Sequence, residues 1–360
     1  MKKSVKVLLG ILIFLIVLIS IIVLFMYFYP GVGKIPDAGV LSAENLDEKG
    51  SFQNEGVLPP NRGSSMPTSP RNKPKGEIPV IKVSDTSRSK DLKFNWLGHS
   101  SIFLRYEEKN ILIDPVLGEY VSPVSFAGLK RFCDIPMTAD QVPDIDILFI
   151  SHDHYDHLDY HTLRKIDPRV SQYIVPLGVD TVLISMGIPA DKIKALSWWG
   201  TFEKDGLTYT LTPGRHFSGR NPLRRSNPTL WGGLYIKGPD KSIYYTGDSG
   251  YCNAFSQVYE KIGAPDLMFV ENGQYNYAWS NVHMFPEETA RAVADAHAKR
   301  AVPVHWGAYV LAPHAWDDPI KGITAASEDL GIKLITPRIG EEVDYSAIDN
   351  FTGHWWEGID

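Results

Sequence analysis

Apolar and polar positions are unevenly distributed along this chain, and the pattern divides it into five stretches. Residues 7–29 carry no charge and consist mainly of Leu, Ile, Val and Phe. A helix of this length rises roughly 34 Å at ~1.5 Å per residue, which is enough to cross the hydrocarbon core of a bilayer. Lys2, Lys3 and Lys6 precede it, whereas only Lys34 and Asp37 lie near its other end, so the positive-inside rule places residues 1–6 in the cytoplasm and the large remainder outside it. No small-x-small cleavage site follows, and we therefore expect an uncleaved single-pass anchor.

The composition changes at residue 30 and again near residue 91. Residues 58–76 are rich in Pro, Ser, Gly and Asn and contain few apolar side chains, so residues 30–90 are expected to form a linker or surface arm without a fold of their own. The globular pattern extends over residues 91–345 and leaves 346–360 as a C-terminal tail.

The globular pattern mixes antiparallel hairpins with βα units. Short apolar or alternating runs predict strands at 94–97, 102–106, 111–114, 146–150, 173–175, 193–198, 207–212, 230–236, 242–245, 266–270, 301–304 and 332–335. Helical spacing predicts helices at 160–166, 179–186, 255–262, 286–299 and 320–330. We therefore expect one domain with two sheets and helices outside them.

Charge and cysteine content exclude some classes of protein. The 360 residues carry a net charge of −6 and no block of Lys and Arg interleaved with aromatic residues, which disfavours nucleic-acid binding. The two cysteines, Cys133 and Cys252, are too few for a disulfide framework or a Cys-based zinc site. Either one disulfide or two unpaired thiols is compatible with the sequence.

The strongest chemical signal follows the predicted strand 146–150. His152, His154, Asp156 and His157 form an H-x-H-x-D-H motif on one short loop, and imidazole nitrogen and carboxylate oxygen are typical ligands of zinc. A solvated loop would explain two histidines, but four ligand types at this spacing after a strand indicate a metal site.

Further ligand types lie at the ends of other predicted strands. His216 follows 207–212, Asp248 follows 242–245 and His305 follows 301–304. Each alone is more often a structural or turn-capping residue, whereas together they complete a set for two ions if Asp248 bridges them. Two ions about 3.5–4 Å apart can share a hydroxide that is nucleophilic at neutral pH. Two Zn²⁺ are the default for such ligands, and iron or manganese is also compatible.

The motif, followed by a lone His, a Gly-Asp and a late His, resembles the pattern of the metallo-β-lactamase-fold hydrolases over residues 91–345. The flanking sequences are similar to the branch of phospholipases D that hydrolyse N-acylphosphatidylethanolamine: WLGHSS at 96–101, SPVSFAGLKRF at 122–132, SHDHYDHLDY at 151–160, YYTGDSGYC at 244–252 and HWGAY at 305–309. The resemblance implies an α/β (α+β) fold, a four-layer αββα sandwich. It also implies that one zinc binds His152, His154 and His216, the other binds Asp156, His157 and His305, and Asp248 bridges them.

The resemblance further implies a phosphodiesterase in which the shared hydroxide attacks phosphorus and Asp156 orients or deprotonates it, and the predicted transmembrane span, which is an addition to the family pattern, would anchor it in the membrane. The products would be phosphatidic acid and an N-acylethanolamine. His283 matches a family histidine near the substrate phosphate, where it would stabilise developing charge, although a lone His before a helix equally suits a structural role. His99 is expected to support a ligand from beneath the metals. Surface or packing roles are expected for His161, His297, His314 and His354.

Alternatives remain open at this point. A metal-dependent lactonase or other acyl-ester hydrolase would use the same ions on a small substrate. A non-catalytic envelope binding module is disfavoured by the complete ligand set, and a nuclease by the acidic charge. Residues 30–90 and the loop 221–227 depart from the family pattern, in which the N-terminal region forms the substrate cavity and the dimer. The acyl group, the head group and a homodimer therefore stay open.

Overall fold

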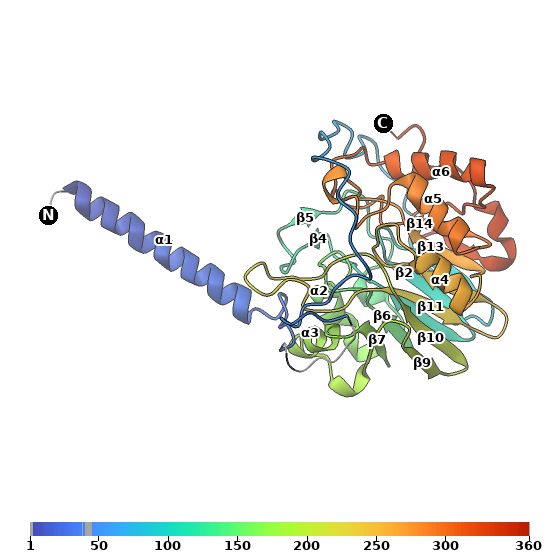
Figure 1. Cartoon of the computed structure of the whole chain (residues 1–360), viewed down its shortest axis with the longest axis horizontal. Helices are drawn as coiled ribbons and strands as arrows, with labels where there is room; N and C mark the ends of the chain where they lie inside the picture. The colour runs from blue at the N-terminus through green and yellow to red at the C-terminus, as the bar shows by residue number, and fades with distance from the viewer. Residues whose placement is uncertain (1–2, 38, 40–44, 360) are drawn as a thin grey trace.

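The computed structural model describes residues 3–37, 39 and 45–359. Figure 1 shows two parts: a long N-terminal helix that projects from the molecule, and a globular body in which two sheets pack face to face. The helix is α1 (Lys3–Phe28), and it begins and ends a little earlier than the predicted span of 7–29.

Two sheets and one small ribbon account for the described strands. The first sheet has the order β15 (Glu342–Asp344), β1 (Lys93–Trp96), β2 (Ile102–Tyr106), β3 (Lys109–Ile113), β6 (Ile147–Phe149), β7 (Tyr173–Pro176) and β8 (Ile193–Leu196). The second has the order β14 (Ala301–Val304), β13 (Leu267–Glu271), β12 (Ser242–Tyr245), β11 (Gly233–Lys237), β10 (Leu207–Thr212) and β9 (Thr201–Lys204). The ribbon pairs β4 (Tyr120–Val121) with β5 (Leu129–Lys130).

Helices cover the outer faces of both sheets, which gives the four layers of an αββα sandwich (Figure 1). The first sheet is covered by α2 (Tyr160–Ile166) and α3 (Val179–Ser185), and the second by α4 (Ala254–Lys261), α5 (Pro286–Asp295) and α6 (Asp318–Leu330).

The central strands are buried on both faces, which explains why their sequences are almost continuously apolar. In β2, Ile102 and Leu104 point into the core between the sheets, whereas Phe103 packs with the helices outside. The same alternation occurs in β6, where Phe149 faces inward and Leu148 outward. The register of these strands is therefore strongly specified, because a shift by one residue would turn every inward-facing side chain outward and every outward-facing one inward.

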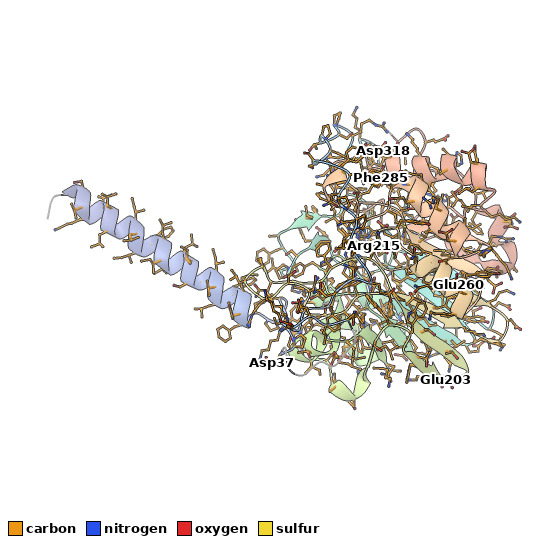
Figure 2. The ribbon with its side chains drawn as sticks, in the orientation of Figure 1. Asp37, Glu203, Arg215, Glu260, Phe285 and Asp318 are labelled. Carbon is orange, nitrogen blue, oxygen red and sulfur yellow. The ribbon has the colours of Figure 1, made fainter. Side chains whose placement is uncertain are left out.

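Among the described residues, one helix is long and apolar enough to span a membrane, Ser4–Phe28 within α1. Its apolar side chains project freely on all sides (Figure 2). The length and composition suit a bilayer-spanning helix.

Several predicted elements differ from the structure. The strand predicted at 193–198 ends at Leu196, and a separate strand, β9, forms the hairpin with β10 because the chain crosses to the other sheet at Trp199 (φ 64°). The run 332–335 makes only an isolated bridge between Leu334 and Ala301. The helix predicted at 286–299 ends at Asp295. In contrast, β15 was not predicted.

Segments outside 91–345 also pack on the globular body. Phe52 is fully buried and belongs to the larger hydrophobic core, and Ile81 N donates a hydrogen bond to Ile339 O. At the other end, Trp356 is 2 % exposed and packs against Trp306. The described residues of the stretch 30–90 thus pack on the globular body as an arm, and residues 346–359 close part of the core.

Candidate metal centre

The predicted ligands lie at one edge of the sandwich because each follows a strand that ends there. His152, His154, Asp156 and His157 occupy the loop after β6, and His216 follows β10. Asp248 and His305 follow β12 and β14, which run parallel to β13 between them. The carboxyl ends of parallel strands meet at the same edge of a sheet, and ligands bind there.

Three ring nitrogens converge in a first group. His154 Nδ1 lies 2.9 Å from His152 Nε2 and 3.3 Å from His216 Nε2. A tetrahedral zinc site with bonds of 2.0–2.1 Å places its nitrogen ligands about 3.3 Å apart. His152, His154 and His216 could therefore hold one ion with little movement.

A second group contains Asp156, His157 and His305, together with His99. Asp156 Oδ2 lies 3.5 Å from His157 Nε2 and 2.9 Å from His99 Nε2. His99 is fully buried beneath the group, where a hydrogen bond to Asp156 would fix the direction of that carboxylate.

Asp248 lies between the two groups. Its Oδ1 is 3.1 Å from His305 Nδ1, and its Oδ2 is 3.2 Å from His157 Nε2 and 3.8 Å from His216 Nε2. One oxygen thus faces the second group alone and the other faces both. This is the placement that a bridging carboxylate requires.

The protonation states suit metal ligation, which needs neutral imidazole and ionised carboxylate. Burial and the neighbouring imidazoles hold the pKa values of His152 and His216 well below the usual histidine range. Burial by itself would raise the pKa of the Asp156 carboxyl, but the His157 and His99 rings hold it well below its usual range. These histidines and this carboxylate are therefore in their ligating forms at neutral pH.

The surroundings of His157 favour positive charge. Burial acts to lower its pKa, but the carboxylates of Asp248, Asp156 and Asp114 raise it well above the usual value. His157 Nε2 and Asp248 Oδ1 are two of the buried side-chain atoms in the described residues that have no hydrogen-bond partner. A divalent cation would satisfy both atoms and replace the proton, so the residues fit a metal ion.

Asp114 supports this centre and was missed in the sequence. It follows β3, it is fully buried, and its Oδ2 accepts hydrogen bonds from His157 Nδ1 (2.7 Å) and Tyr245 Oη (2.6 Å). A carboxylate behind a ligating histidine fixes its tautomer and leaves the other nitrogen free for the metal. Its position after a strand was the only available signal.

A cavity of about 260 Å³ opens over the ligands and contains His283. Its lining residues are His154, Asp156, Phe217, Asp248, Gln274, Trp279, Val282, His283, His305 and Leu311. His283 Nδ1 is 3.2 Å from Oε1 of Glu271, the buried last residue of β13, and only 12 % of the His283 side chain is exposed. Burial raises the pKa of Glu271 to about 7, although the facing His283 acts to lower it.

The remaining histidines lie away from the ligand groups. His161 contacts the Pro123 carbonyl, His297 stacks on Tyr259, and His354 faces Glu357 at the surface. His314 is buried against Tyr275. Cys133 and Cys252 are free thiols, so the alternative of a disulfide is not realised.

Comparison with known proteins assigns this chain to a family. Residues 109–306 match the family described as Beta-lactamase superfamily domain. An uncharacterized protein of Mycobacterium tuberculosis is 39 % identical over 270 residues, covering 74 % of this chain and 71 % of its own. N-acyl-phosphatidylethanolamine-hydrolyzing phospholipase D 1 of Caenorhabditis elegans is 32 % identical over 284 residues, covering 73 % and 79 %.

Solved structures support the fold. The metallo hydrolase Igni18 of the archaeon Ignicoccus hospitalis superposes with a TM-score of 0.53 at 21 % identity, covering 70 % of this chain and 97 % of its own. Because the family match spans more than half of the chain, the assignment rests on sequence as well as on fold. The chain belongs to the metallo-β-lactamase-fold hydrolases and is related to the phospholipases D that hydrolyse N-acylphosphatidylethanolamine.

Proposed function

We propose that this protein is a membrane-anchored, zinc-dependent phosphodiesterase that hydrolyses N-acylphosphatidylethanolamine-type phospholipids to phosphatidic acid and an N-acylethanolamine. The observation that carries the proposal is the cavity in which both ligand groups, Asp248 and His283 face one space. Relatives named for this reaction at 32 % identity support the choice of substrate.

The charges in the cavity explain why a phosphodiester would require the metal. Asp156 and Asp248 are ionised, and among the described lining residues there is no Lys or Arg. Without metal these two carboxylates disfavour an anion beside them. When bound, two divalent ions would reverse this charge and supply Lewis acidity and an activated water.

The protein side chains position the substrate and hold protons. In this proposal His283 faces the phosphate, and Glu271 behind it keeps the imidazole oriented and favours its charged form. Burial by itself would lower the pKa of His283, but the hydrogen bond and charge of Glu271 raise it. A protonated His283 would stabilise negative charge that develops on the phosphate oxygens. Asp156, held by His99, would orient the attacking water.

The helix α1 gives such an enzyme direct access to its substrate. A bilayer-spanning anchor keeps the cavity near the surface where phospholipids present their phosphodiester. In the proposed topology the N-terminus is cytoplasmic and the catalytic domain extracytoplasmic, as the basic residues before α1 indicate.

The proposal is tested by incubating the purified full chain with N-acylphosphatidylethanolamine in mixed micelles, with added zinc or with chelator. We expect chelator-sensitive release of N-acylethanolamine that Asp248→Ala abolishes. Asp240→Ala, which removes an exposed carboxylate in the turn between β11 and β12, is the matched control and should leave activity unchanged. Zinc-loaded protein that leaves the phospholipid intact but opens a lactone would overturn the proposal.

A further inference from the structure

The chain that leaves α1 is docked on the catalytic domain and does not swing freely. Val32 is 1 % exposed, and the Lys34 amide donates a hydrogen bond to Ser185 Oγ (2.8 Å) at the end of α3. In the last turn of α1, the Met26 carbonyl accepts a hydrogen bond from Asn221 Nδ2 (2.7 Å). The junction between helix and domain is therefore held at several independent points.

Arg220 connects this junction to the metal-ligand loop. Its Nη2 donates to Gly31 O (2.8 Å) and its Nε to Val32 O (3.2 Å). On the other side, Nη1 donates to the carbonyls of Asp153 (2.6 Å) and Leu158 (2.9 Å), the first between His152 and His154 and the second directly after His157. Arg220 is only 5 % exposed, so displacing either side would leave a buried cation with two of its four backbone acceptors missing.

Two surface loops flank the same end of α1. A Cβ added at Gly31 would meet Pro123 O, in the loop between β4 and β5, at 2.5 Å, which shows how closely this loop approaches the junction. In the loop 217–225, the guanidinium of Arg224 lies 4.0 Å from the ring of Tyr27 in α1. Figure 1 shows β4 and β5 on the side of the domain from which α1 leaves.

Both loops expose large apolar side chains, and basic residues lie within the loop 217–225 and next to the loop 122–128. Phe126 is 77 % exposed in the β4–β5 loop and Leu223 is 50 % exposed in the loop 217–225, beside Arg224. Lys130, at the end of β5, is also exposed, with its Nζ 3.5 Å from Oε2 of the exposed Glu119. Apolar side chains at loop tips, with cationic side chains beside them, suit the interface of a bilayer. There the apolar side chains enter the boundary of the acyl chains and the cations contact lipid phosphates.

We propose that the loops 122–128 and 217–225 form a membrane-contact surface that rests on the bilayer in one fixed orientation, held there by the docked segment 29–36 and Arg220. The inference rests on the proposed function in that α1 spans the membrane. Phe217, in the loop 217–225, is 43 % exposed and also lines the cavity over the ligands, so in this proposal the cavity lies next to the membrane face. A phospholipid would reach the metal centre without leaving the interface.

The test places a fluorophore at single introduced cysteines in the full chain, reconstituted into phosphatidylcholine liposomes that contain lipid with a nitroxide quencher near the head group. Phe126→Cys and Leu223→Cys report on the proposed surface. Leu330→Cys is the matched control, because Leu330 is 49 % exposed at the end of α6. Wild-type protein treated in parallel measures labelling of the partly buried Cys133 and Cys252.

We expect labels at positions 126 and 223 to lose most of their fluorescence and the label at 330 to keep it. Equal quenching at the three positions would overturn the proposal. Gly31→Val, which forces the docked segment away from Pro123, should reduce quenching at position 126, whereas Gly10→Val, with no atom near its Cβ, should not. Unchanged quenching in Gly31→Val would refute the fixed orientation. No substrate is used, so the result is independent of whether the protein is a phosphodiesterase.

Discussion

Asp114→Asn is expected to weaken the metal centre without altering any ligand. Asp114 Oδ1 accepts from Ser151 N (2.7 Å), and Oδ2 accepts from Ser151 Oγ, His157 Nδ1 and Tyr245 Oη. An amide has one acceptor oxygen, so the introduced asparagine turns an NH₂ group toward at least one donor in either orientation of its side chain. The substitution also removes the charge that holds the proton of His157 on Nδ1.

The size of the effect follows from these contacts. Hydrogen bonds to charged groups contribute about 1.5–3 kcal/mol each, and breaking a buried charge pair costs about 3–5 kcal/mol. We therefore expect a loss of stability of about 3–5 kcal/mol. Metal affinity should fall about 10–100-fold, the usual effect of losing a carboxylate behind a ligating histidine.

Competition with a chelator of known affinity measures the metal affinity, and thermal unfolding of the metal-free chain measures the stability. Tyr245→Phe is the matched variant, because it removes one donor to the same oxygen and leaves His157 paired. It should lower stability while keeping metal affinity close to that of the wild type. If Asp114→Asn binds metal as tightly as the wild type, or if Tyr245→Phe weakens binding equally, the role assigned to Asp114 is refuted.

Two further predictions concern other carboxylates. Glu271→Gln should lower kcat about 10–100-fold, because a charge-assisted hydrogen bond of about 1.5–3 kcal/mol to His283 is lost. The double variant Glu271→Gln/His283→Gln should be no slower than His283→Gln alone. Additive losses of kcat in the double variant would contradict this pairing. Burial by itself would raise the pKa of Asp266, but the hydrogen bonds that it accepts from Lys299 and Ser242 outweigh burial and lower it. The ionised carboxylate therefore stabilises the fold at neutral pH, and this contribution is lost as the pH falls through the folded-state pKa. Asp266→Asn should therefore lower the unfolding temperature at pH 7 and have little effect in acid, and a constant difference across pH would argue against this.

The convergence of the candidate ligands at one edge of the sandwich could be predicted because each property involved is local. His216, Asp248 and His305 each follow an apolar run that forms a strand in the structure, and strands of one sheet end at a shared edge. Asp114 also follows such a run, but its contact with His157 joins separate strands of the first sheet, and no sequence spacing marks it. Glu271 was not identified from the sequence for the same reason, because the role proposed for it depends on its contact with His283.

The less successful predictions depend on partners that composition does not reveal. The apolar run 332–335 has strand character, yet it pairs with Ala301 at a single bridge. Conversely, β15 pairs with β1 at the edge of the first sheet and is short and mostly charged, which conceals it. The arm was expected to lack a fold of its own, but its contacts with Arg220 and with the core could not be inferred from its Pro- and Ser-rich composition.

The most direct test of the central claim is to follow oxygen during hydrolysis of N-acylphosphatidylethanolamine by the zinc-loaded full chain in H₂¹⁸O, with mass spectrometry of the products. Attack of water on phosphorus predicts one ¹⁸O in phosphatidic acid and none in the N-acylethanolamine. Label in a released fatty acid, with no labelled phosphatidic acid, would show that the cavity cleaves an acyl bond and would contradict the account.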